Sequence, residues 1–311
     1  MKISFVCPIF NKRKYLPDVV SSIKNQIGDF ESEFIFVDDG SVDGSLDLVK
    51  SLTRNWSNVL YLQHPNKGPA FSTQRGIEKA TGDYLKLVGG DDVMLDNCVN
   101  ILLKTIKKDS SVAAFSNYEL TNEFNTSKFS NCTKLKDYKI ISNPVEQTLI
   151  SCFSGTTPNL YCNKSVKMSG GCYKNLFVED FSLVLKLSKF GSFSFINNLT
   201  SLGPKDDPNR IMVGNEKQLI HDYNATVFYF IQENPDISKT IKKKACIKAL
   251  GRTEKWIRRV LKKKIFNEIN YLRIKYFLNQ RNEIDFIRRC CEIFYSSKYK
   301  TDTEIRYKIK I

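Results

Sequence analysis

The chain has 311 residues, of which 41% are hydrophobic and 26% are charged. This length and balance exclude a disordered protein and allow one large domain, or one domain with an appendage. The net charge of +15 comes from the C-terminal part, because residues 239–311 hold 22 Lys and Arg against 7 Asp and Glu, whereas residues 1–238 hold 26 of each. The sequence therefore combines a neutral body with a basic tail.

Strands and helices are predicted to alternate over residues 1–116. Short apolar runs typical of strands cover residues 3–7, 33–37, 59–63, 84–88 and 112–116. Between them, apolar residues recur at helical spacing within residues 16–23, 46–52, 77–80 and 99–106. This alternation is typical of βαβ units, so we predict an α/β fold with a mostly parallel, Rossmann-like sheet flanked by helices.

The pattern is less regular after residue 116. Residues 117–142 are polar and weakly periodic, which predicts a loop or an edge hairpin. A helix is predicted ahead of Gly191, after a turn-rich stretch. Residues 201–215 are rich in Gly, Pro and Asp, which break both helix and strand, and this predicts a mobile loop. From about Gln218 to the C-terminus the periodicity is helical again, which predicts a C-terminal helical extension.

The cysteines and the N-terminus indicate the compartment. Nine cysteines are present without a C-x-x-C pair, and only two histidines accompany them. This favours reduced thiols in a cytosolic protein over a disulfide framework or a metal site. No signal-peptide pattern opens the chain, and no uncharged stretch of about 18 apolar residues could span a membrane. We therefore expect a cytoplasmic protein.

Three acidic pairs are the main chemical signals of the sequence. Asp38-Asp39 and Asp91-Asp92 each follow a predicted strand, and Glu179-Asp180 precedes a predicted helix. The carboxyl ends of strands in an open parallel sheet border the ligand crevice, so the first two pairs can converge on one pocket. One pair suits hydrogen bonding, and the other suits Mg²⁺ or Mn²⁺, which bind carboxylates together with a substrate's phosphates. The pairs indicate a nucleotide-diphosphate substrate, a bridging metal and a separate base.

Five motifs follow one another along the chain, at residues 6–12, 37–43, 66–68, 80–84 ahead of Asp91-Asp92, and 179–180. Taken in this order, they resemble family 2 glycosyltransferases of the GT-A fold. The resemblance implies an inverting, metal-dependent hexosyltransferase that moves a sugar from a nucleotide-sugar donor, preferably a UDP-sugar, to a hydroxyl group. The acceptor would be a glycan or a polyprenyl-linked oligosaccharide for a surface polysaccharide such as O-antigen or capsule. Residues 1–116 would form the donor half, 117–217 the acceptor half and 218–311 a basic helical region.

The resemblance places the donor beside the first predicted strand. Pro8 and Phe10 would hold the base, and Asp39 would accept a hydrogen bond from it. The other expected donor-binding residues in this region are Asn11, Asp38, Asn66, Gly68, Arg75 and Asp92. From the residues alone, Phe10 also fits an ordinary core aromatic, and residues 38–41 also fit a turn and helix cap.

The metal motif departs from the family pattern. The family usually has Asp-x-Asp, whereas this chain has Gly89 at the position of the first Asp, followed by Gly90, Asp91 and Asp92. The resemblance implies Asp91 as the ligand of Mg²⁺ or Mn²⁺, with the diphosphate and waters completing the shell. A helix cap without a metal is the alternative.

A second departure concerns the phosphate-binding arginine. The family often has Ala-Arg-Asn where this chain has Ser-Thr-Gln at residues 72–74, with Arg75 one step further on. Lys205 and Arg210, on the predicted turn-rich loop, are therefore candidates to neutralise the diphosphate. Closure of such a loop over bound donor would exclude water.

The resemblance also implies a catalytic base. Asp180 would take the proton of the acceptor hydroxyl, with Glu179 in a supporting role, and general-base help is worth ~10²–10⁴ in rate. The alternative is that the two acids only stabilise a helix N-terminus through its dipole.

The basic tail suggests a partner. Lysine and arginine clusters at residues 242–244, 258–259, 262–264 and 288–289 alternate with Trp256 and aliphatic residues. Such helices suit an anionic membrane surface, and we favour peripheral attachment to the inner face of the cell membrane. The alternative is a solvated helical face packed on the body or on a second subunit, which leaves a homo-oligomer open.

Two other functions fit parts of the sequence. A nucleic-acid-binding protein with a basic arm would explain the tail but not the acidic pairs, so we expect no nucleic-acid partner. A sugar nucleotidyltransferase would need a Gly-rich, basic phosphate loop near the N-terminus, and residues 8–11 are not one.

Overall fold

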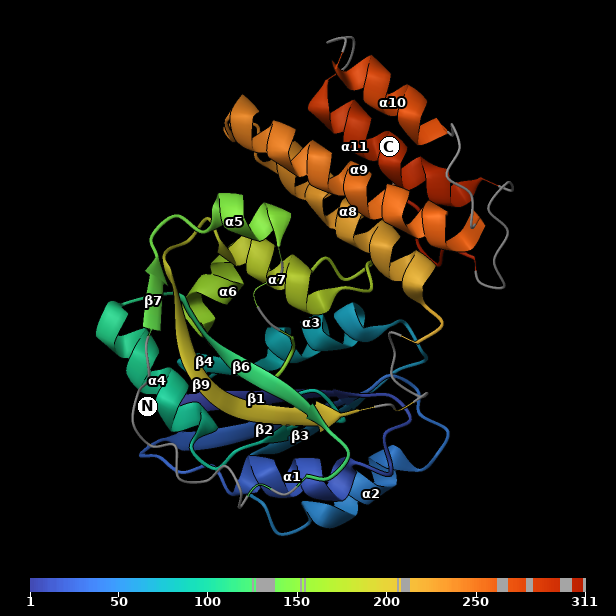
Figure 1. Ribbon diagram of the computed structural model, residues 1–311. Helices are drawn as coiled ribbons and strands as arrows, with labels where there is room; N and C mark the ends of the chain where they lie inside the picture. Colours follow the sequence, from blue (N-terminus) through green and yellow to red (C-terminus); the bar gives the residue numbers. More distant parts are fainter. Residues whose placement is uncertain are drawn as a thin grey trace.

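The computed structural model describes residues 1–124, 126, 138–151, 153, 155–205, 207, 213–261, 268–277, 282–296 and 304–309. Within these residues, nine strands form one sheet with the order β3-β2-β1-β4-β8-β6-β9-β5, and β7 pairs with β9. Helices cover both faces of this sheet, and a group of C-terminal helices lies against one side (Figure 1). The predicted fold class, an α/β sheet with a C-terminal helical extension, is confirmed.

The N-terminal half of the sheet is parallel, as the sequence predicts. Its strands are β1 (Lys2–Ile9), β2 (Glu31–Asp38), β3 (Val59–Gln63) and β4 (Tyr84–Leu87). Ile9 pairs with Asp38 and Asp38 pairs with Gln63, so neighbouring strands end at the same edge. Buried residues of β1 run almost without interruption, as expected for a strand that is covered on both faces.

Helices connect these strands and build the two layers of the core. They are α1 (Leu16–Lys24), α2 (Ser45–Leu52), α3 (Pro69–Lys79) and α4 (Cys98–Asp109). Leu16, Val19, Val20 and Ile23 form the buried stripe of α1, spaced by three or four residues as an amphipathic helix requires. In Figure 1, α1 and α2 lie on one face of the sheet and α3 lies on the other.

The other half of the sheet is mixed, and the sequence pattern predicted it less well. Its strands are β5 (Val93–Met94), β6 (Ala113–Thr121), β7 (Tyr138–Ile141), β8 (Asn159–Cys162) and β9 (Phe193–Pro204). Strand β8 runs antiparallel to both β4 and β6. The helices of this half are α5 (Val145–Ile150), α6 (Asn163–Ser169) and α7 (Glu179–Leu187).

Two predictions for this half need correction. Residues 117–121 extend β6 inside the sheet, and residues 138–141 form β7, which pairs with β9, while residues 125 and 127–137 lie outside the described part. The predicted loop at 201–215 is wrong at its start, because residues 201–204 belong to β9. Pairing with β6 along most of its length overrides the local composition there. Residues 206 and 208–212 of the predicted loop lie outside the described part.

The C-terminal region consists of α8 (Glu216–Glu233), α9 (Lys239–Leu261), α10 (Glu268–Phe277), α11 (Glu283–Glu292) and a short 3-10 helix (Ile293–Tyr295). Its hydrophobic core is continuous with Phe181 and Leu185 of α7. Trp256 is 2% exposed, and its ring centroid lies 4.9 Å from that of Phe294. Trp256 therefore belongs to the core, not to an exposed apolar stripe on α9. None of the described helices is long and apolar enough to cross a bilayer.

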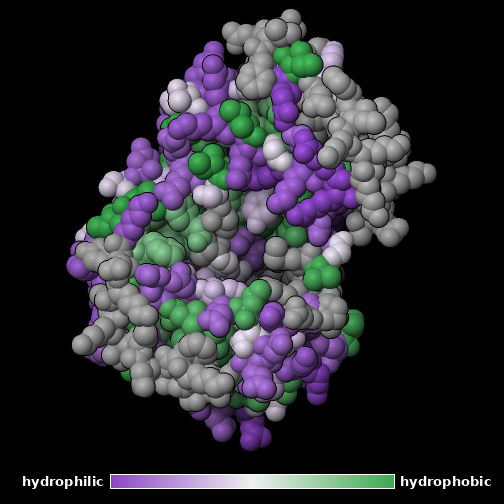
Figure 2. Space-filling view, in the orientation of Figure 1, coloured by the Kyte–Doolittle hydropathy of each residue, from purple (hydrophilic) through white to green (hydrophobic). Residues whose placement is uncertain are grey.

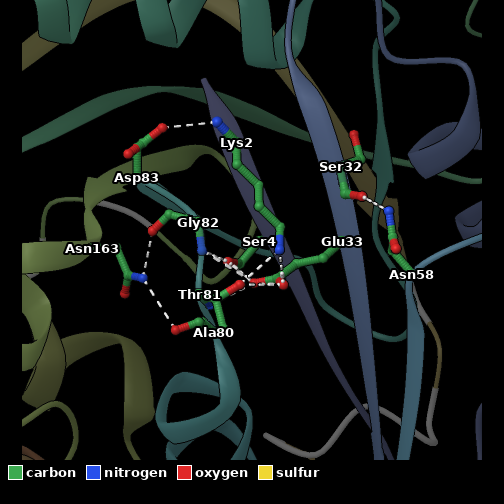
Figure 3. Close-up of polar contacts among 10 residues, drawn as sticks. All are labelled: Lys2, Ser4, Ser32, Glu33, Asn58, Ala80, Thr81, Gly82, Asp83 and Asn163. Carbon is green, nitrogen blue, oxygen red and sulfur yellow. Dashed lines mark hydrogen bonds and ion pairs between the residues drawn. The ribbon is translucent and has the colours of Figure 1, made fainter.

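Glu33 ties the opposite, N-terminal edge of the parallel strands together (Figure 3). It accepts hydrogen bonds from Ser4 Oγ at 2.5 Å and from Thr81 Oγ1 at 2.6 Å, and it lies 2.6 Å from Lys2 Nζ. Burial alone would raise its pKa, but the hydrogen bonds from Lys2, Ser4 and Thr81 prevail and lower the pKa of Glu33 to about 2. The cluster joins β1, β2 and the connection before β4, away from the strand ends that form the cavity described next.

Candidate active site

A cavity of about 210 Å³ opens at the carboxyl edge of the parallel strands. Its wall is built from Pro8, Ile9, Phe10 and Lys12 at the end of β1, Asp39 after β2, residues 89–92 after β4 and residues 177–180 at the start of α7. Asp39, Asp91 and Asp180 all line this cavity although they lie far apart in the sequence. Pro8 and Phe10 are partly exposed in the same wall, so Phe10 is not a buried core aromatic.

Asp39 holds the loop that follows β3. Its Oδ1 accepts a hydrogen bond from the Lys67 amide at 2.7 Å, and its Oδ2 accepts one from the Gly68 amide at 2.9 Å. His64 Nδ1 lies 3.3 Å from Oδ1. Gly68 has a φ of +98°, a conformation that favours glycine. A carboxylate has about four acceptor directions, so Asp39 can still accept a hydrogen bond from a ligand in the cavity.

Asp91 forms an ion pair with Lys12. The distance from Lys12 Nζ to Asp91 Oδ2 is 2.5 Å, and Lys12 is only 4% exposed. The Lys12 amide donates to Ser45 Oγ at 2.9 Å, which fixes the backbone that carries the ammonium group. A buried ammonium group needs an anionic partner, and Asp91 provides one. The cavity therefore contains a protein cation beside the carboxylate that the sequence assigns to a metal.

Asp92 is held by neutral hydroxyl groups. Tyr118 donates to Oδ1 at 2.9 Å, and Thr157 donates to Oδ2 at 2.5 Å. A Cβ atom added at Gly89 would lie 2.6 Å from Asp92 Oδ2. The held side chain of Asp92 thus occupies the space that a side chain at Gly89 would need, which explains the glycine at this position.

A buried lysine supports the turn that carries Thr157. Lys86, in β4, is completely buried, and its ammonium group donates to the carbonyls of Thr157 and Asn159, the second at 2.9 Å. Burial lowers the pKa of Lys86. This contact fixes the turn whose Thr157 hydroxyl holds Asp92.

Glu179 and Asp180 form the first turn of α7. Thr156 Oγ1 donates to Glu179 Oε1 at 3.0 Å, and the Phe181 amide donates to Asp180 Oδ1 at 2.7 Å. Burial raises the pKa of Glu179, and the charge of Asp180 raises it further; burial also raises the pKa of Asp180. Carboxyl groups with raised pKa values in a cavity are suited to proton transfer near neutral pH.

Several residues that the sequence assigned to the donor lie outside the cavity wall. Asp38 is buried, and its Oδ2 accepts a hydrogen bond from the Ser41 amide at 3.1 Å. Asn11 accepts a hydrogen bond from the Val42 amide at 2.9 Å. Both side chains hold the turn after β2, so the structure gives them a supporting position.

The predicted phosphate-binding cations Arg75 and Lys205, and the predicted donor residue Asn66, do not line the cavity either. Arg75 Nη1 donates to the Gln63 carbonyl at 3.0 Å, at the end of β3. Asn66 is exposed. Lys205 is exposed, and its amide donates to the Thr121 carbonyl at 2.9 Å. Arg210 lies outside the described residues.

Sequence reasoning missed several residues of the cavity wall, namely Lys12, Tyr118, Thr156, Leu219 and Tyr223. Lys12 lies at the end of a recognised motif, so its position was a usable signal. Leu219 and Tyr223 come from α8, and nothing in their helical pattern distinguishes them from other residues of an amphipathic helix. Because α8 contributes to the wall, the C-terminal region is part of the site.

Residues 4–158 match the family described as Glycosyl transferase family 2. Glycosyltransferase GlyG of Streptococcus pneumoniae is 33% identical over 37% of this chain and 38% of its own length. A GalNAc(5)-diNAcBac-PP-undecaprenol beta-1,3-glucosyltransferase of Campylobacter jejuni is 27% identical over 62% of this chain and 61% of its own. The putative teichuronic acid biosynthesis glycosyltransferase TuaG of Bacillus subtilis is 27% identical over 49% and 60%. The chain spans less than two thirds of each of these relatives.

Solved structures show the same fold over nearly the whole chain. Residues 1–349 of S. aureus TarS in complex with UDP have a TM-score of 0.65 and 18% identity, covering 95% of this chain and 89% of that one. A mannosyltransferase of Pyrobaculum calidifontis in complex with GDP-Man and Mn²⁺ has a TM-score of 0.52 and 10% identity, covering 94% and 86%. The fold and the cavity define a protein of the GT-A class. The chain belongs to glycosyltransferase family 2, whose matching region contains the motifs of residues 6–12, 37–43 and 91–92.

Proposed function

We propose that the protein is an inverting glycosyltransferase that moves a sugar from a UDP-sugar to a hydroxyl of a glycan or lipid-linked acceptor. The observation that carries this proposal is the meeting of Asp39, Asp91 and Asp180 in one cavity. Residues 1–116 would bind the donor and residues 117–217 the acceptor, with α8 closing the site. S. aureus TarS, which shares the fold, has been solved with UDP and with UDP-GlcNAc.

The nucleotide would bind between Pro8, Phe10 and Asp39. Phe10 offers an aromatic ring in the cavity wall, and Asp39 offers a fixed carboxylate that can accept a hydrogen bond from the N–H group of a uracil ring. The amides of Lys67 and Gly68 hold Asp39 in place, so its orientation is set before the donor arrives. Such preorganisation reduces the entropy cost of binding.

Asp91 would hold the divalent metal. Among the described residues, no group of three or more His, Cys, Asp and Glu side chains could enclose an ion. Mg²⁺ is commonly bound by one or two carboxylates together with a substrate's phosphates, so the site fits a metal that arrives with the donor. The metal would neutralise the diphosphate as the sugar leaves. The ammonium group of Lys12, which pairs with Asp91, would be a second cation beside the diphosphate.

Asp180 would be the general base and Glu179 its support. Burial and the charge of Asp180 raise the pKa of Glu179, so two negative charges on the pair are disfavoured and a single one remains to act as the base. The ionised Asp180 would take the acceptor proton as the hydroxyl oxygen attacks the anomeric carbon from the side opposite the nucleotide.

The surface of α9 supports a location at the membrane. Lys243, Lys244, Lys248 and Lys255 are exposed on this helix, with Ile247 56% exposed among them. Figure 2 shows hydrophilic residues over the C-terminal helices. A basic surface of this kind would attach the protein peripherally to the anionic inner face of the cell membrane. The Campylobacter jejuni relative is named for an undecaprenol-linked substrate, and a polyprenyl-linked acceptor would lie at that surface.

A panel of UDP-sugars tests this function. Each sugar is incubated with the protein with Mn²⁺, with Mg²⁺ or with EDTA, and release of UDP is measured. We expect metal-dependent UDP release from one or two donors, and release that depends on Asp180. If no nucleotide sugar is hydrolysed or protects the protein against thermal unfolding, the proposal is wrong.

A further inference from the structure

The last described segment of the chain, residues 304–309, contacts the loop that Asp39 holds. The Arg306 guanidinium donates a hydrogen bond to the Asn66 carbonyl, and Tyr307 Oη donates to the Lys67 carbonyl at 3.1 Å. We call residues 304–309 the C-terminal strap and residues 66–68 the donor loop. The amides of Lys67 and Gly68 point to Asp39, while the carbonyls of Asn66 and Lys67 point to the strap. The donor loop is thus fixed from both sides.

The C-terminal strap is itself anchored in the core. Ile305 and Ile309 are each 8% exposed and belong to the hydrophobic core of the C-terminal helices. The Arg306 amide donates to Gln218 Oε1 at 2.7 Å, and the Ile309 amide donates to Tyr295 Oη at 2.8 Å. These anchors fix the backbone on each side of Tyr307.

A buried polar network connects these anchors to the other wall of the cavity. Asp222 Oδ2 accepts hydrogen bonds from Gln218 Nε2 at 2.8 Å and from the Phe177 amide at 2.7 Å. Phe177 lines the cavity three residues before Asp180. Gln218 therefore connects two parts of the site. Its side-chain oxygen binds the C-terminal strap, and its side-chain nitrogen binds Asp222, which holds Phe177 in the loop before Asp180.

His221 closes the same network. Its Nδ1 lies 2.6 Å from Asp222 Oδ1, and its Nε2 lies 2.8 Å from Tyr295 Oη. Tyr295 Oη also accepts the Ile309 amide, so the imidazole ring of His221 links Asp222 to the residue that anchors the C-terminal strap. His221 and Asp222 are completely buried, so breaking this chain would leave polar groups unpaired in the core.

We propose that Arg306 and Tyr307 of the C-terminal strap are positioning residues of the donor site, which hold the donor loop in its binding conformation. The inference rests on the proposed function, because it needs the donor to bind at Asp39. Arg306 Nη1 also lies 3.6 Å from the place where a Cβ on Gly68 would be, so the guanidinium borders the donor loop directly. Residues 304–309 lie outside the region that matches the family, residues 4–158, and follow the C-terminal helices in the chain.

Calorimetric titration of the full-length protein with UDP in the presence of Mn²⁺ tests the proposal. We expect Arg306→Ala to weaken UDP binding roughly tenfold and Tyr307→Phe about threefold, because each removes a hydrogen bond that fixes the loop. Lys308→Ala is the matched control, since it removes one positive charge from the same segment and its ammonium group faces the Tyr295 ring instead. We expect its affinity to stay within twofold of the wild type.

Hydrogen exchange of the unliganded protein provides a readout that does not depend on the nucleotide. The amides of Lys67 and Gly68 should exchange faster in Arg306→Ala and Tyr307→Phe than in Lys308→Ala. With an active donor, the two variants should raise KM for the donor and leave kcat nearly unchanged. A general structural role would instead lower the thermal stability and kcat together.

The outcomes separate the two proposals. If the wild type does not bind UDP, the proposed function fails, and the strap proposal fails with it. If the wild type binds UDP and both variants bind it as well as Lys308→Ala does, only the strap proposal is overturned. If Arg306→Ala folds poorly, the UDP affinity of Tyr307→Phe alone tests the strap proposal. This variant removes only the hydroxyl group that bonds to Lys67, so it should fold normally.

Discussion

The ammonium group of Lys12 lies 2.5 Å from Oδ2 of Asp91, the carboxylate that we propose as the metal ligand. A divalent metal must compete with this cation or use the other oxygen of the carboxylate. Lys12 is almost fully buried, so its ammonium group has little access to solvent if it loses Asp91. Metal binding and the position of Lys12 should therefore be linked.

Lys12→Met should change the response to metal. Without the competing ammonium group, the Mn²⁺ concentration that half-saturates UDP binding should fall about threefold to tenfold, because Asp91 becomes available. In EDTA, where the diphosphate has lost the metal, UDP binding should weaken by about tenfold. Calorimetric titrations with UDP at several Mn²⁺ concentrations measure both effects. Lys14→Met is the control, because Lys14 does not line the cavity. Identical titrations of Lys12→Met and wild type would refute the linkage.

Substitutions of Asp180 and Glu179 should distinguish the roles of these two residues. Asp180→Asn should lower sugar transfer by at least about 100-fold, since it removes the base, while UDP binding stays within about twofold. Glu179→Gln keeps an oxygen for the Thr156 hydroxyl and resembles the protonated acid, so it should retain most of the activity. Rates of transfer for the two variants, measured under saturating donor, check this. If Glu179→Gln were inactive and Asp180→Asn active, the roles would be exchanged.

The pH dependence follows from the raised pKa values of the pair. Burial raises the pKa of Glu179, as does the neighbouring charge of Asp180, and burial raises the pKa of Asp180. A base acts only when ionised, so a raised pKa moves the acid limb of kcat/KM upward from the ordinary Asp value of about 4. We expect kcat/KM to rise between about pH 5 and 7. An acid limb centred near pH 4 would show that the base is not a buried carboxyl group.

Glu33 should contribute to stability in a defined pH window. Its pKa in the folded protein is about 2, below the ordinary glutamate value of 4.5, so its contribution is complete above pH 4.5 and is lost as the pH falls toward 2. Glu33→Gln should lower the free energy of unfolding by about 1–2 kcal/mol at pH 7. The difference from wild type should shrink below pH 4.5. Denaturant unfolding of both proteins between pH 2.5 and 7 measures this, with exposed Glu31→Gln as the control.

The parallel half of the fold could be predicted from sequence because local signals and packing agree there. Residues 59–63 were predicted as a strand with the same ends as β3, and the predicted strands at 3–7 and 33–37 lie within β1 and β2. Strand β9 was not predicted, since it carries buried polar residues such as Ser194 and Thr200. Those hydroxyls bond to Asp109 and Ser116, and a sequence pattern does not reveal such partners.

The site was predictable to the extent that it follows strand ends. Asp39 and Asp91 follow β2 and β4, so parallel topology brings them together. Arg75 was placed by analogy with a family motif, but its own helix turns the side chain toward the Gln63 carbonyl. Lys12 ends the recognised motif of residues 6–12, so its position carries a signal, whereas Tyr223 depends on how a distant helix packs, which no local spacing encodes.

The most direct test of the account is a crystal structure of the protein with UDP and Mn²⁺. We predict the uracil ring beside Phe10 with a hydrogen bond to Asp39, the metal between Asp91 and the diphosphate, and Asp180 on the open side where a sugar would extend. A nucleotide bound elsewhere, or bound with its diphosphate pointing away from Asp91, would contradict it.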